Sequence, residues 1–412
     1  MDSKLHEDAL DIVTSAIAAV KPDAAVRRAL AGMTFPGRVF LVAVGKAGWQ
    51  MAHAALQCLP TPPAQGIVVT KYGHVPSALP GIRCLEAGHP VPDENSFAAT
   101  QAVLDMTADL SPADTVLFLL SGGGSALFEK PLVPGAELQD ITRQLLACGA
   151  DIVEMNTIRK RLSAVKGGRF AAHCAPARVQ AVVLSDILGD PPDMIASGPA
   201  ALDLSTCGDA QKIARKYNLQ LSPAARACLD TETPRQLDNM QMQIIGSVRE
   251  LCAAAAAQCR ALGYEPLYLT DRLNCEAREA GRFLAAIARS HAGDGKKLAF
   301  LAGGETVVHL TGSGLGGRNQ EIALAAAELL SGLSNAAVVS VGSDGTDGPT
   351  DAAGGYADGD TQAALTAAGW DIADTLRQND AYHALQAVGG LIRTGPTGTN
   401  VNDVSIALIG AL

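Results

Sequence analysis

Apolar residues in the first half of this chain follow two alternating patterns. Short continuous runs rich in Val, Leu and Ile end at glycine or polar residues, as buried strands do. Between them, segments such as residues 93–109 and 135–155 have apolar positions at helical spacing, and residues 2–31 open the chain with one or two helices. This alternation predicts a parallel sheet with helices on both faces. The predicted strands are residues 39–44, 66–70, 116–120 and 179–184.

The alternation resumes after a polar, proline-containing stretch at about 219–241. Residues 305–311 alternate in polarity and are predicted to form a half-exposed strand. A chain of 412 residues also exceeds what one hydrophobic core usually organises. We therefore predict two domains, residues 1–240 and 241–412. The second contains predicted helices at 247–262 and 276–291 and strands at 265–270, 297–302, 337–342 and 405–410.

Composition and charge narrow the class of protein. Hydrophobic residues make up 48% of the chain but aromatic residues only 4%, so the core is built mainly from Ala, Val, Leu and Ile. A net charge of −10 without a long basic run argues against nucleic-acid binding. No apolar stretch approaches the roughly 20 residues that span a bilayer, and the acidic amino terminus is not typical of a secretory signal. Nine cysteines without a C-x-x-C pair are typical of reduced thiols, so we expect a cytoplasmic protein.

A glycine-rich loop, termed the SGGGS loop, follows one of the predicted buried strands. It reads Ser121-Gly122-Gly123-Gly124-Ser125. The glycines let backbone N–H groups approach a ligand closely, and two hydroxyl groups lie beside them. This combination suits an anion with several oxygens, most often phosphate. The alternative is an ordinary flexible turn.

A lysine follows another predicted strand, in the sequence Gly45-Lys46-Ala47-Gly48. At the start of a helix a lysine is electrostatically unfavourable unless an anion binds there too. The loop is not a Walker A motif, because Ala47 replaces the Ser or Thr and no upstream glycine has the required spacing. We predict that Lys46 contacts a phosphate or carboxylate; the alternative is a solvated lysine.

The most basic part of the chain lies at residues 159–169 and contains Arg159 and Lys166. A solvated helix face is the simple interpretation. The adjacent Gly167-Gly168 favours the alternative of a loop that grips the substrate.

Three carboxylates follow the strand predicted at 179–184, from Asp186, Asp190 and Asp193. Proteins typically bind Mg²⁺ through one or two carboxylates, and water and phosphate complete its octahedron. One of these groups can instead accept the proton of a substrate hydroxyl. A turn capped by Asp explains one aspartate well and three less well.

Residues 312–317 read GSGLGG, which formally matches the G-x-G-x-x-G fingerprint of dinucleotide binding. The sequence that follows, from Arg318 and Asn319 onward, is more polar than the start of a dinucleotide-binding helix. No acidic residue closes a strand about 20 positions later, since Asp344 lies further on. Arg318 at the start of a helix is better explained as a residue whose guanidinium binds a carboxylate or phosphate through two N–H groups than as part of a dinucleotide-binding fingerprint.

Two dense polar loops, residues 342–351 and 394–403, flank predicted strands of the second domain. They are not EF-hands, because the acidic and glycine spacing does not match and no glutamate closes the loop. Each can be only a turn, but two in one domain favour a shared site. Candidate binding residues in them are Asp344, Asp347, Thr399 and Asn400.

Long motifs run through the chain in a fixed order. The first half contains GKAGWQMA (45–52), EAGHPVPDENS (86–96), SGGGSALFEKP (121–131), IRKRLSAVKGGRFA (158–171) and SDILGDPPDMIASGP (185–199). The second half contains GGETVVHLTGSGLGGRNQEIAL (303–324), GSDGTDGPTDAAGG (342–355) and TGPTGTNVND (394–403). Together they resemble the class II glycerate 2-kinase family, and those of the second half are similar to its MOFRL domain.

The resemblance implies a larger Rossmann-like, doubly wound α/β domain with a mainly parallel sheet, a smaller α/β MOFRL domain, and an active site in the cleft between them. It implies transfer of the ATP γ-phosphoryl group to the 2-hydroxyl of D-glycerate, with Mg²⁺, to give 2-phosphoglycerate and ADP. Within the family, the expected active-site residues are those at Lys46 and Arg318. We expect no nucleic-acid or membrane partner, and a monomer or homodimer.

On this basis individual residues receive predicted roles. Lys46 and Arg318 stabilise the transferring phosphoryl group or the glycerate carboxylate. Asp186 and Asp190 hold Mg²⁺ or activate the hydroxyl, two roles that stay open, and Glu305 orients Arg318 or the metal. The other predicted binding residues are Ser121, Gly122, Gly123, Gly124, Ser125, Arg159, Lys166, Asn319, Asp344, Asp347, Thr399 and Asn400.

Two other functions compete with this one. An NAD(P)H-dependent hydroxypyruvate reductase, an older label among relatives, needs a working dinucleotide fingerprint, and the one here lacks its acidic partner. A non-catalytic sensor would bind glycerate and nucleotide but form no ADP, and the many charged loops argue against it.

Overall fold

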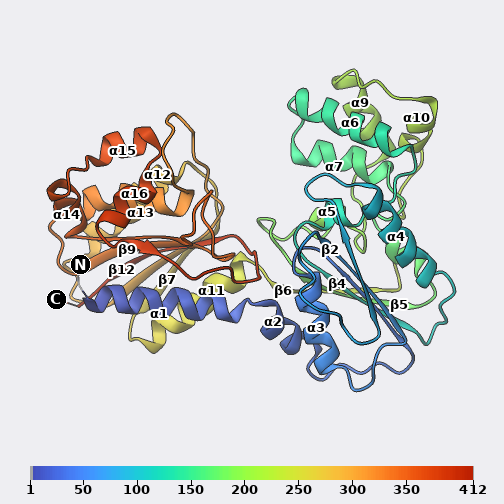
Figure 1. The fold of residues 1–412 in the computed structure, drawn as a ribbon, viewed down its shortest axis with the longest axis horizontal. Helices are drawn as coiled ribbons and strands as arrows, with labels where there is room; N and C mark the ends of the chain where they lie inside the picture. The colour runs from blue at the N-terminus through green and yellow to red at the C-terminus, as the bar shows by residue number, and fades with distance from the viewer. Residues whose placement is uncertain (1–2, 412) are drawn as a thin grey trace. The chain divides into compact units, whose positions relative to one another are not determined.

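The computed structural model describes residues 3–411 of the chain. It divides into two compact units, one formed by Pro22–Ile245 and the other by Met1–Lys21 together with Gly246–Leu412. They are termed the central unit and the terminal unit, and each is described by itself (Figure 1). The border after Ile245 lies close to the one predicted after residue 240.

The central unit contains a six-stranded sheet in the order β3-β2-β1-β4-β5-β6. From β3 to β5 neighbouring strands run parallel, so their carboxyl ends lie at one edge of the sheet. The strands are β1 (Val39–Val44), β2 (Gln65–Lys71), β3 (Ile82–Ala87), β4 (Thr115–Leu120), β5 (Arg178–Leu184) and β6 (Met240–Gly246).

The two faces of this sheet belong to separate cores. Along β1, Phe40 and Val42 are buried together with Val103 of α4, whereas Leu41 is buried with Met51 of α3. Successive side chains of a strand point to opposite faces, so a strand that is buried throughout needs helices on both sides. The helices are α2 (Pro22–Leu30), α3 (Gly48–Cys58), α4 (Glu94–Met106), α5 (Gly124–Leu127), α6 (Gly135–Ala147), α7 (Ile152–Arg161), α8 (Arg169–His173), α9 (Cys207–Lys216) and α10 (Pro223–Leu229), with a 3₁₀ turn at Ile195–Ser197.

The segment predicted as one helix over residues 135–155 forms two, α6 and α7. Gly149 follows α6 with a φ of 70°, a conformation that ends helices. A capping box of Asp151 and Glu154 then starts α7. The polar stretch before the border likewise contains a short helix, α10, which Ser222 caps.

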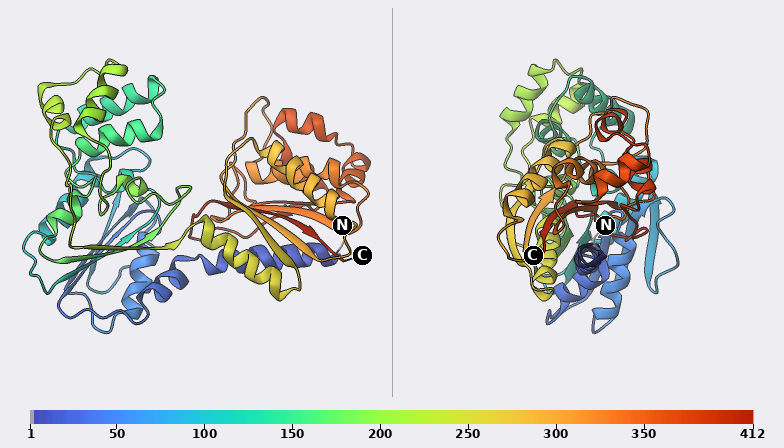
Figure 2. Two further views of the ribbon diagram at one scale, coloured as in Figure 1. Left: turned by 180° about the vertical axis from the view of Figure 1, so that it is seen from behind. Right: turned by 90° about the vertical axis from the view of Figure 1, so that its left-hand side faces the viewer.

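The terminal unit contains a second six-stranded sheet, in the order β11-β10-β9-β12-β8-β7. β7 and β8 pair in parallel, whereas β12 runs antiparallel to β8 and β9, and β10 antiparallel to β9 and β11. Figures 1 and 2 show α1 and α11 side by side on one face of this sheet and the helices from α12 to α16 on the other. The strands are β7 (Glu265–Leu273), β8 (Leu298–Gly304), β9 (Ala336–Gly342), β10 (Gly354–Asp358), β11 (Leu391–Ile392) and β12 (Asp403–Ile409). The helices are α1 (Ser3–Ala19), α11 (Val248–Ala261), α12 (Ala277–His291), α13 (Arg318–Leu330), α14 (Thr361–Ala367), α15 (Ile372–Gln378) and α16 (Ala381–Ala387).

The first helix differs from the predicted division of the chain. The sequence assigns residues 1–21 to the first domain, but α1 packs against α11, β9 and β12 of the terminal unit. Asp8 on α1 accepts a hydrogen bond from Tyr264 Oη over 2.8 Å. An amphipathic pattern predicts which face of a helix is buried but not which sheet covers it.

The strand predicted over residues 305–311 is absent, and that prediction is wrong. Gly304, the last residue of β8, pairs with the last residue of β7, Leu273, and with the first residue of β12, Asp403. Both neighbouring strands therefore end where β8 ends. Beyond Gly304 the pairing is reduced to one isolated parallel bridge, between Val307 and Glu276, with the Val307 N–H donating to Cys275 O over 3.0 Å.

Candidate active site

In the central unit, the loops of three predicted motifs meet at the carboxyl edge of the parallel sheet. β1, β4 and β5 are adjacent, and they lead into Lys46, the SGGGS loop and Asp186. The Lys46 N–H donates to Gly122 O over 2.9 Å, and the Ala47 N–H donates to Ser121 Oγ over 3.1 Å. These hydrogen bonds fasten the lysine loop to the SGGGS loop.

The middle glycines of the SGGGS loop lie against side chains of neighbouring loops. A Cβ on Gly122 would lie 2.2 Å from Asp186 Oδ2. A Cβ on Gly123 would lie 3.0 Å from His89 Cδ2 and 3.3 Å from Lys46 Cγ, and Gly123 has a φ of 87°. Glycine is thus required here because a carboxylate, an imidazole and a lysine stem approach the backbone closely.

Basic side chains surround His89, which follows β3. Burial lowers the pKa of His89, and the nearby Lys46, Lys71 and His74 lower it further. Within residues 3–411, the Lys46 ammonium has neither a hydrogen-bond nor an ion-pair partner. The positive charges of Lys46 and Lys71 suit a bound anion. Neither His89 nor His74 is among the predicted site residues, although the motif at residues 86–96 contains His89.

Two predicted binding residues support the SGGGS loop through its backbone. Lys166 is fully buried, and its Nζ donates to Ser125 O over 2.8 Å and to Phe128 O over 3.0 Å. The same ammonium pairs with Glu129 over 3.2 Å, and burial lowers the pKa of Lys166 to about 8. The Arg159 guanidinium also donates to Ser125 O, over 3.0 Å. These contacts favour a positioning role for both residues.

The segment that follows β5 has an unusual backbone. Asp190, Ala196 and Ser197 have φ values of 52°, 51° and 63°, in the left-handed region that non-glycine residues rarely adopt. Such residues cost about 1–3 kcal/mol each and cluster at functional sites. Asp190 Oδ1 is buried and has no hydrogen-bond partner in the described part of the chain, and Ser197 Oγ lies 3.3 Å from Ser125 Oγ. The strained segment therefore contacts the SGGGS loop and carries an unsatisfied carboxylate oxygen.

In the terminal unit, strand register explains the surroundings of Arg318. Because β12 is antiparallel to its neighbours, Asp403 at its start pairs with Gly304 and Gly342 at the ends of β8 and β9. Arg318, the first residue of α13, donates through Nε and Nη2 to the two Asp403 oxygens over 2.5 Å and 2.9 Å. Its Nη1 lies 3.7 Å from Glu305 Oε1. The sequence analysis assigned no role to Asp403.

The pair of Arg318 and Asp403 has shifted pKa values. Burial raises the pKa of Asp403 to about 6, although the hydrogen bonds from Arg318 oppose the shift. Burial alone would lower the pKa of Arg318, but its hydrogen bonds to Asp403 raise it instead. Arg318 is thus a permanent cation whose orientation depends on a carboxylate that titrates near neutral pH.

Two other predicted residues stabilise the start of α13. Asp347 accepts hydrogen bonds from the N–H groups of Asn319 and Gln320 over 3.2 Å and 2.9 Å, which caps the helix. Burial raises the pKa of Asp347. Asn319 is itself buried, and its Oδ1 accepts from Ser340 Oγ over 2.5 Å. These contacts indicate that Asp347 and Asn319 stabilise the start of α13, the helix that carries Arg318.

The remaining predicted residues lie in the two polar loops. Asp344 Oδ1 accepts from the Thr346 N–H over 2.9 Å, and Asn400 Oδ1 accepts from the N–H two residues later over 3.3 Å, so both shape turns. Thr399 Oγ1 is buried and donates to Val20 O over 3.1 Å, just beyond the end of α1. Thr399 thus anchors its loop to the first helix of the terminal unit.

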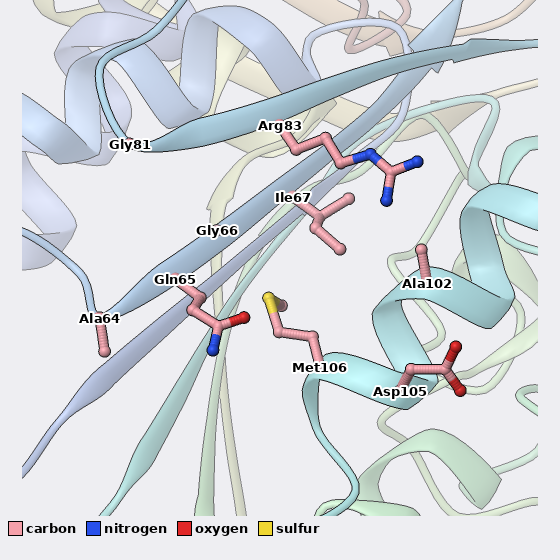
Figure 3. Close-up of a pocket in the computed structure, with 9 residues that line it drawn as sticks. All are labelled: Ala64, Gln65, Gly66, Ile67, Gly81, Arg83, Ala102, Asp105 and Met106. Carbon is pink, nitrogen blue, oxygen red and sulfur yellow. The ribbon is translucent and has the colours of Figure 1, made fainter.

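Both units contain more than one cavity. One of about 450 Å³ lies beside Arg318 in the terminal unit. Another, of about 530 Å³, lies at the amino ends of β2 and β3 in the central unit, where Figure 3 shows Arg83 and Met106 beside it. No predicted site residue lines this second cavity.

Two features are absent from residues 3–411. No helix in this range is long and apolar enough to cross a membrane. In the same range, no three His, Cys, Asp or Glu side chains are grouped in a way that could hold a metal ion.

Comparison with known proteins extends over the whole chain. Residues 8–230 match a family described as a domain of unknown function, DUF4147, and residues 298–403 match the MOFRL family. A D-glycerate 2-kinase of Thermotoga maritima is 50% identical over 98% of each chain. A putative hydroxypyruvate reductase of Agrobacterium vitis is 42% identical over 91% of this chain and 88% of its own.

The same relationship is evident in three dimensions. The crystal structure of a glycerate kinase from Thermotoga maritima superimposes with a TM-score of 0.95 at 49% identity, covering 99% of this chain and all of its own. The mixed α/β architecture and the MOFRL domain expected from the sequence are thereby confirmed. The chain belongs to the glycerate kinase family whose members join a DUF4147 domain to a MOFRL domain.

Proposed function

We propose that this protein is an ATP-dependent glycerate 2-kinase, which transfers the γ-phosphoryl group of ATP to the 2-hydroxyl of D-glycerate and forms 2-phosphoglycerate and ADP. The observation that carries this proposal is the 50% identity to a D-glycerate 2-kinase over 98% of each chain. The local chemistry agrees, because Lys46 and Arg318 each provide positive charge for an anionic reactant.

Phosphoryl transfer requires mainly that the reactants be positioned and that charge on the moving oxygens be neutralised. We propose that Lys46 and the SGGGS loop bind one anionic group, with His89 beside them. Arg318, oriented by Asp403, binds a second anionic group. Backbone contacts from Lys166 support the SGGGS loop by holding Ser125 O.

Asp186 and Asp190 have two proposed roles, to bind Mg²⁺ that arrives with ATP or to accept the proton of the 2-hydroxyl. The buried, unpartnered Oδ1 of Asp190 supports either role, since both satisfy a carboxylate oxygen. Mg²⁺ at this position would neutralise phosphate oxygens.

The product identifies the reaction. The protein is incubated with D-glycerate, ATP and Mg²⁺, and the product is then given to enolase alone. We expect phosphoenolpyruvate to form, because enolase acts on 2-phosphoglycerate directly. A product that needs phosphoglycerate mutase before enolase would place the phosphoryl group at another position and refute the proposal.

Reduction of hydroxypyruvate is the second candidate, and the name of the Agrobacterium vitis relative favours it. In this chain, the glycines of the GSGLGG segment at residues 312–317, which formally matches a dinucleotide-binding fingerprint, have another explanation. A Cβ on Gly312 would lie 2.3 Å from Gln378 O, and one on Gly317 would lie 2.3 Å from Asp347 Cγ. These glycines permit close packing within the unit. If NADH absorbance falls when the protein is mixed with NADH and hydroxypyruvate, reductase activity becomes the better-supported function.

We also propose that the protein is cytoplasmic and is a monomer or homodimer. Its nine cysteines are all free thiols, which agrees with a reducing compartment. Light scattering coupled to size-exclusion chromatography measures the assembly, and a trimer or larger species would contradict the second proposal.

A further inference from the structure

The cavity of about 450 Å³ in the terminal unit lies beside the GSGLGG loop and the start of α13. Close packing fixes this loop, because a Cβ on Gly314 would lie 2.5 Å from Asp380 Cβ. Asn379 Oδ1 also accepts from the N–H groups of Thr311 and Gly312 over 2.8 Å and 2.9 Å. The cavity therefore has a wall that the protein holds in place by itself.

Much of the lining is apolar. Val308, Leu310 and Pro349 contribute to it, and Leu310 is 82% exposed. Covering apolar surface stabilises a complex by about 25 cal/mol per Å². The exposed Leu310 side chain at this cavity therefore favours a ligand with a bulky or flat apolar part, which would cover it.

Two polar side chains of the lining lack partners. Thr306 is 5% exposed and Glu321 1% exposed, and both line the cavity. Within residues 3–411, Thr306 Oγ1 and Glu321 Oε2 have no hydrogen-bond partner, whereas the other Glu321 oxygen accepts from Asn379 Nδ2 over 2.9 Å. Buried polar atoms are nearly always paired. Hydroxyl or amino groups of a ligand are suitable partners for both atoms.

One side of the cavity is charged. Arg318 lines it, and its guanidinium gives Nε and Nη2 to Asp403, which leaves Nη1 with only a longer ion-pair contact, 3.7 Å from Glu305 Oε1. A guanidinium edge held in one orientation suits a phosphate oxygen. The cavity thus combines apolar walls, buried polar atoms and one cation.

We propose that this cavity binds the nucleoside of ATP and ADP, with the phosphates directed to Arg318. The inference rests on the proposed kinase function, which supplies two reactants of very different size. Ligand pockets of about 300–1,000 Å³ have mostly apolar walls with a few polar groups. A nucleoside matches this description, whereas a three-carbon acid has little apolar surface and fills little of the space.

Calorimetric titration of the full chain with ADP, and separately with D-glycerate, tests the assignment. Leu310→Ser removes the exposed apolar wall, and Ser313→Trp fills the cavity from its lining. Val307→Ser is the matched control, because Val307 is an exposed apolar residue of the same segment, 48% exposed, that does not line the cavity. Circular dichroism melting checks that each variant folds.

We expect the Kd for ADP to rise at least about tenfold in Leu310→Ser, equivalent to about 1.4 kcal/mol, and more in Ser313→Trp. The Kd for D-glycerate stays within about twofold in both, and Val307→Ser leaves both constants unchanged. An unchanged Kd for ADP in the two cavity variants overturns the inference, as does weaker D-glycerate binding with normal ADP binding. Either of these two results would refute only the assignment of the cavity, because the wild type could still be a kinase. A wild type that makes no ADP would refute the proposed function itself.

Discussion

Lys166→Met is expected to destabilise the central unit strongly. The ammonium and its partner Glu129 are both fully buried, and neither Glu129 oxygen has a hydrogen bond within residues 3–411 apart from this ion pair. Removing one member of a buried pair leaves an uncompensated charge, which costs about 3–5 kcal/mol. The carbonyl oxygen of Phe128 loses its side-chain donor as well, and that of Ser125 keeps only the donor from Arg159. The loss is a large part of the about 5–15 kcal/mol that stabilises a typical domain.

The double variant Lys166→Met, Glu129→Leu separates stability from function. Because both charges are removed, most of the lost free energy of unfolding should return. Activity should not return fully, because the lysine that bonds both Ser125 O and Phe128 O is still missing and Arg159 alone holds Ser125 O. Lys212→Met is the control, since Lys212 is 74% exposed and a surface ion pair contributes at most about 1 kcal/mol.

Urea unfolding followed by tryptophan fluorescence measures these changes in one unit. The chain has two tryptophans, Trp49 in the central unit and Trp370 in the terminal unit, so a Trp370→Phe background makes the signal specific. If Lys166→Met lowers the free energy of unfolding by less than about 1 kcal/mol, as substitutions at exposed positions do, the buried ion pair does not support the loop. A double variant no more stable than the single one would refute the charge argument.

Three further predictions concern activity. Lys46→Ala and Arg318→Ala should each lower kcat/KM about a hundredfold or more, as loss of other charge-stabilising groups does, and near-normal turnover by both would contradict their proposed roles. Asp403, with a pKa raised to about 6, should make kcat/KM fall as pH drops through 6, and Asp403→Asn should abolish that limb of the pH profile. Because its folded pKa lies above the ordinary 3.8, Asp403 contributes stability at low pH that is lost as pH rises from about 4 to 6, which acid-range thermal melts can detect. Gly122→Ala, whose Cβ would lie 2.2 Å from Asp186 Oδ2, should lower kcat/KM at least about tenfold, whereas Gly293→Ala, with nothing within 4 Å, should not.

Most buried strands of the central unit could be predicted because they are continuous apolar runs. β3 (Ile82–Ala87) was not predicted, since it is a half-buried edge strand in which Arg83 and Glu86 interrupt the pattern. The helices α14 to α16 were also missed, each being only seven residues long. Short elements give little periodicity from which to predict them.

The position of the candidate loops was predictable where they follow parallel strands, as at Lys46 and the SGGGS loop. Asp403 was not predicted because it begins an antiparallel strand, and strand direction cannot be inferred from the sequence pattern. For Lys166 the sequence predicted a binding residue but not its complete burial. Burial depends on contacts with residues such as Glu129, which lies far away along the chain.

The packing of α1 has a consequence for the order in which the protein folds during synthesis. Its apolar residues, among them Ile12 and Val13, leave the ribosome before the whole central unit, yet the α11, β9 and β12 that cover them are made only after residue 245. The central unit is continuous in sequence and can fold in the meantime. Until the last strand is complete, the first helix carries an exposed apolar stripe, which is a natural contact for chaperones during translation. The terminal unit can therefore close only after the central unit has been made, around a helix that was made before it.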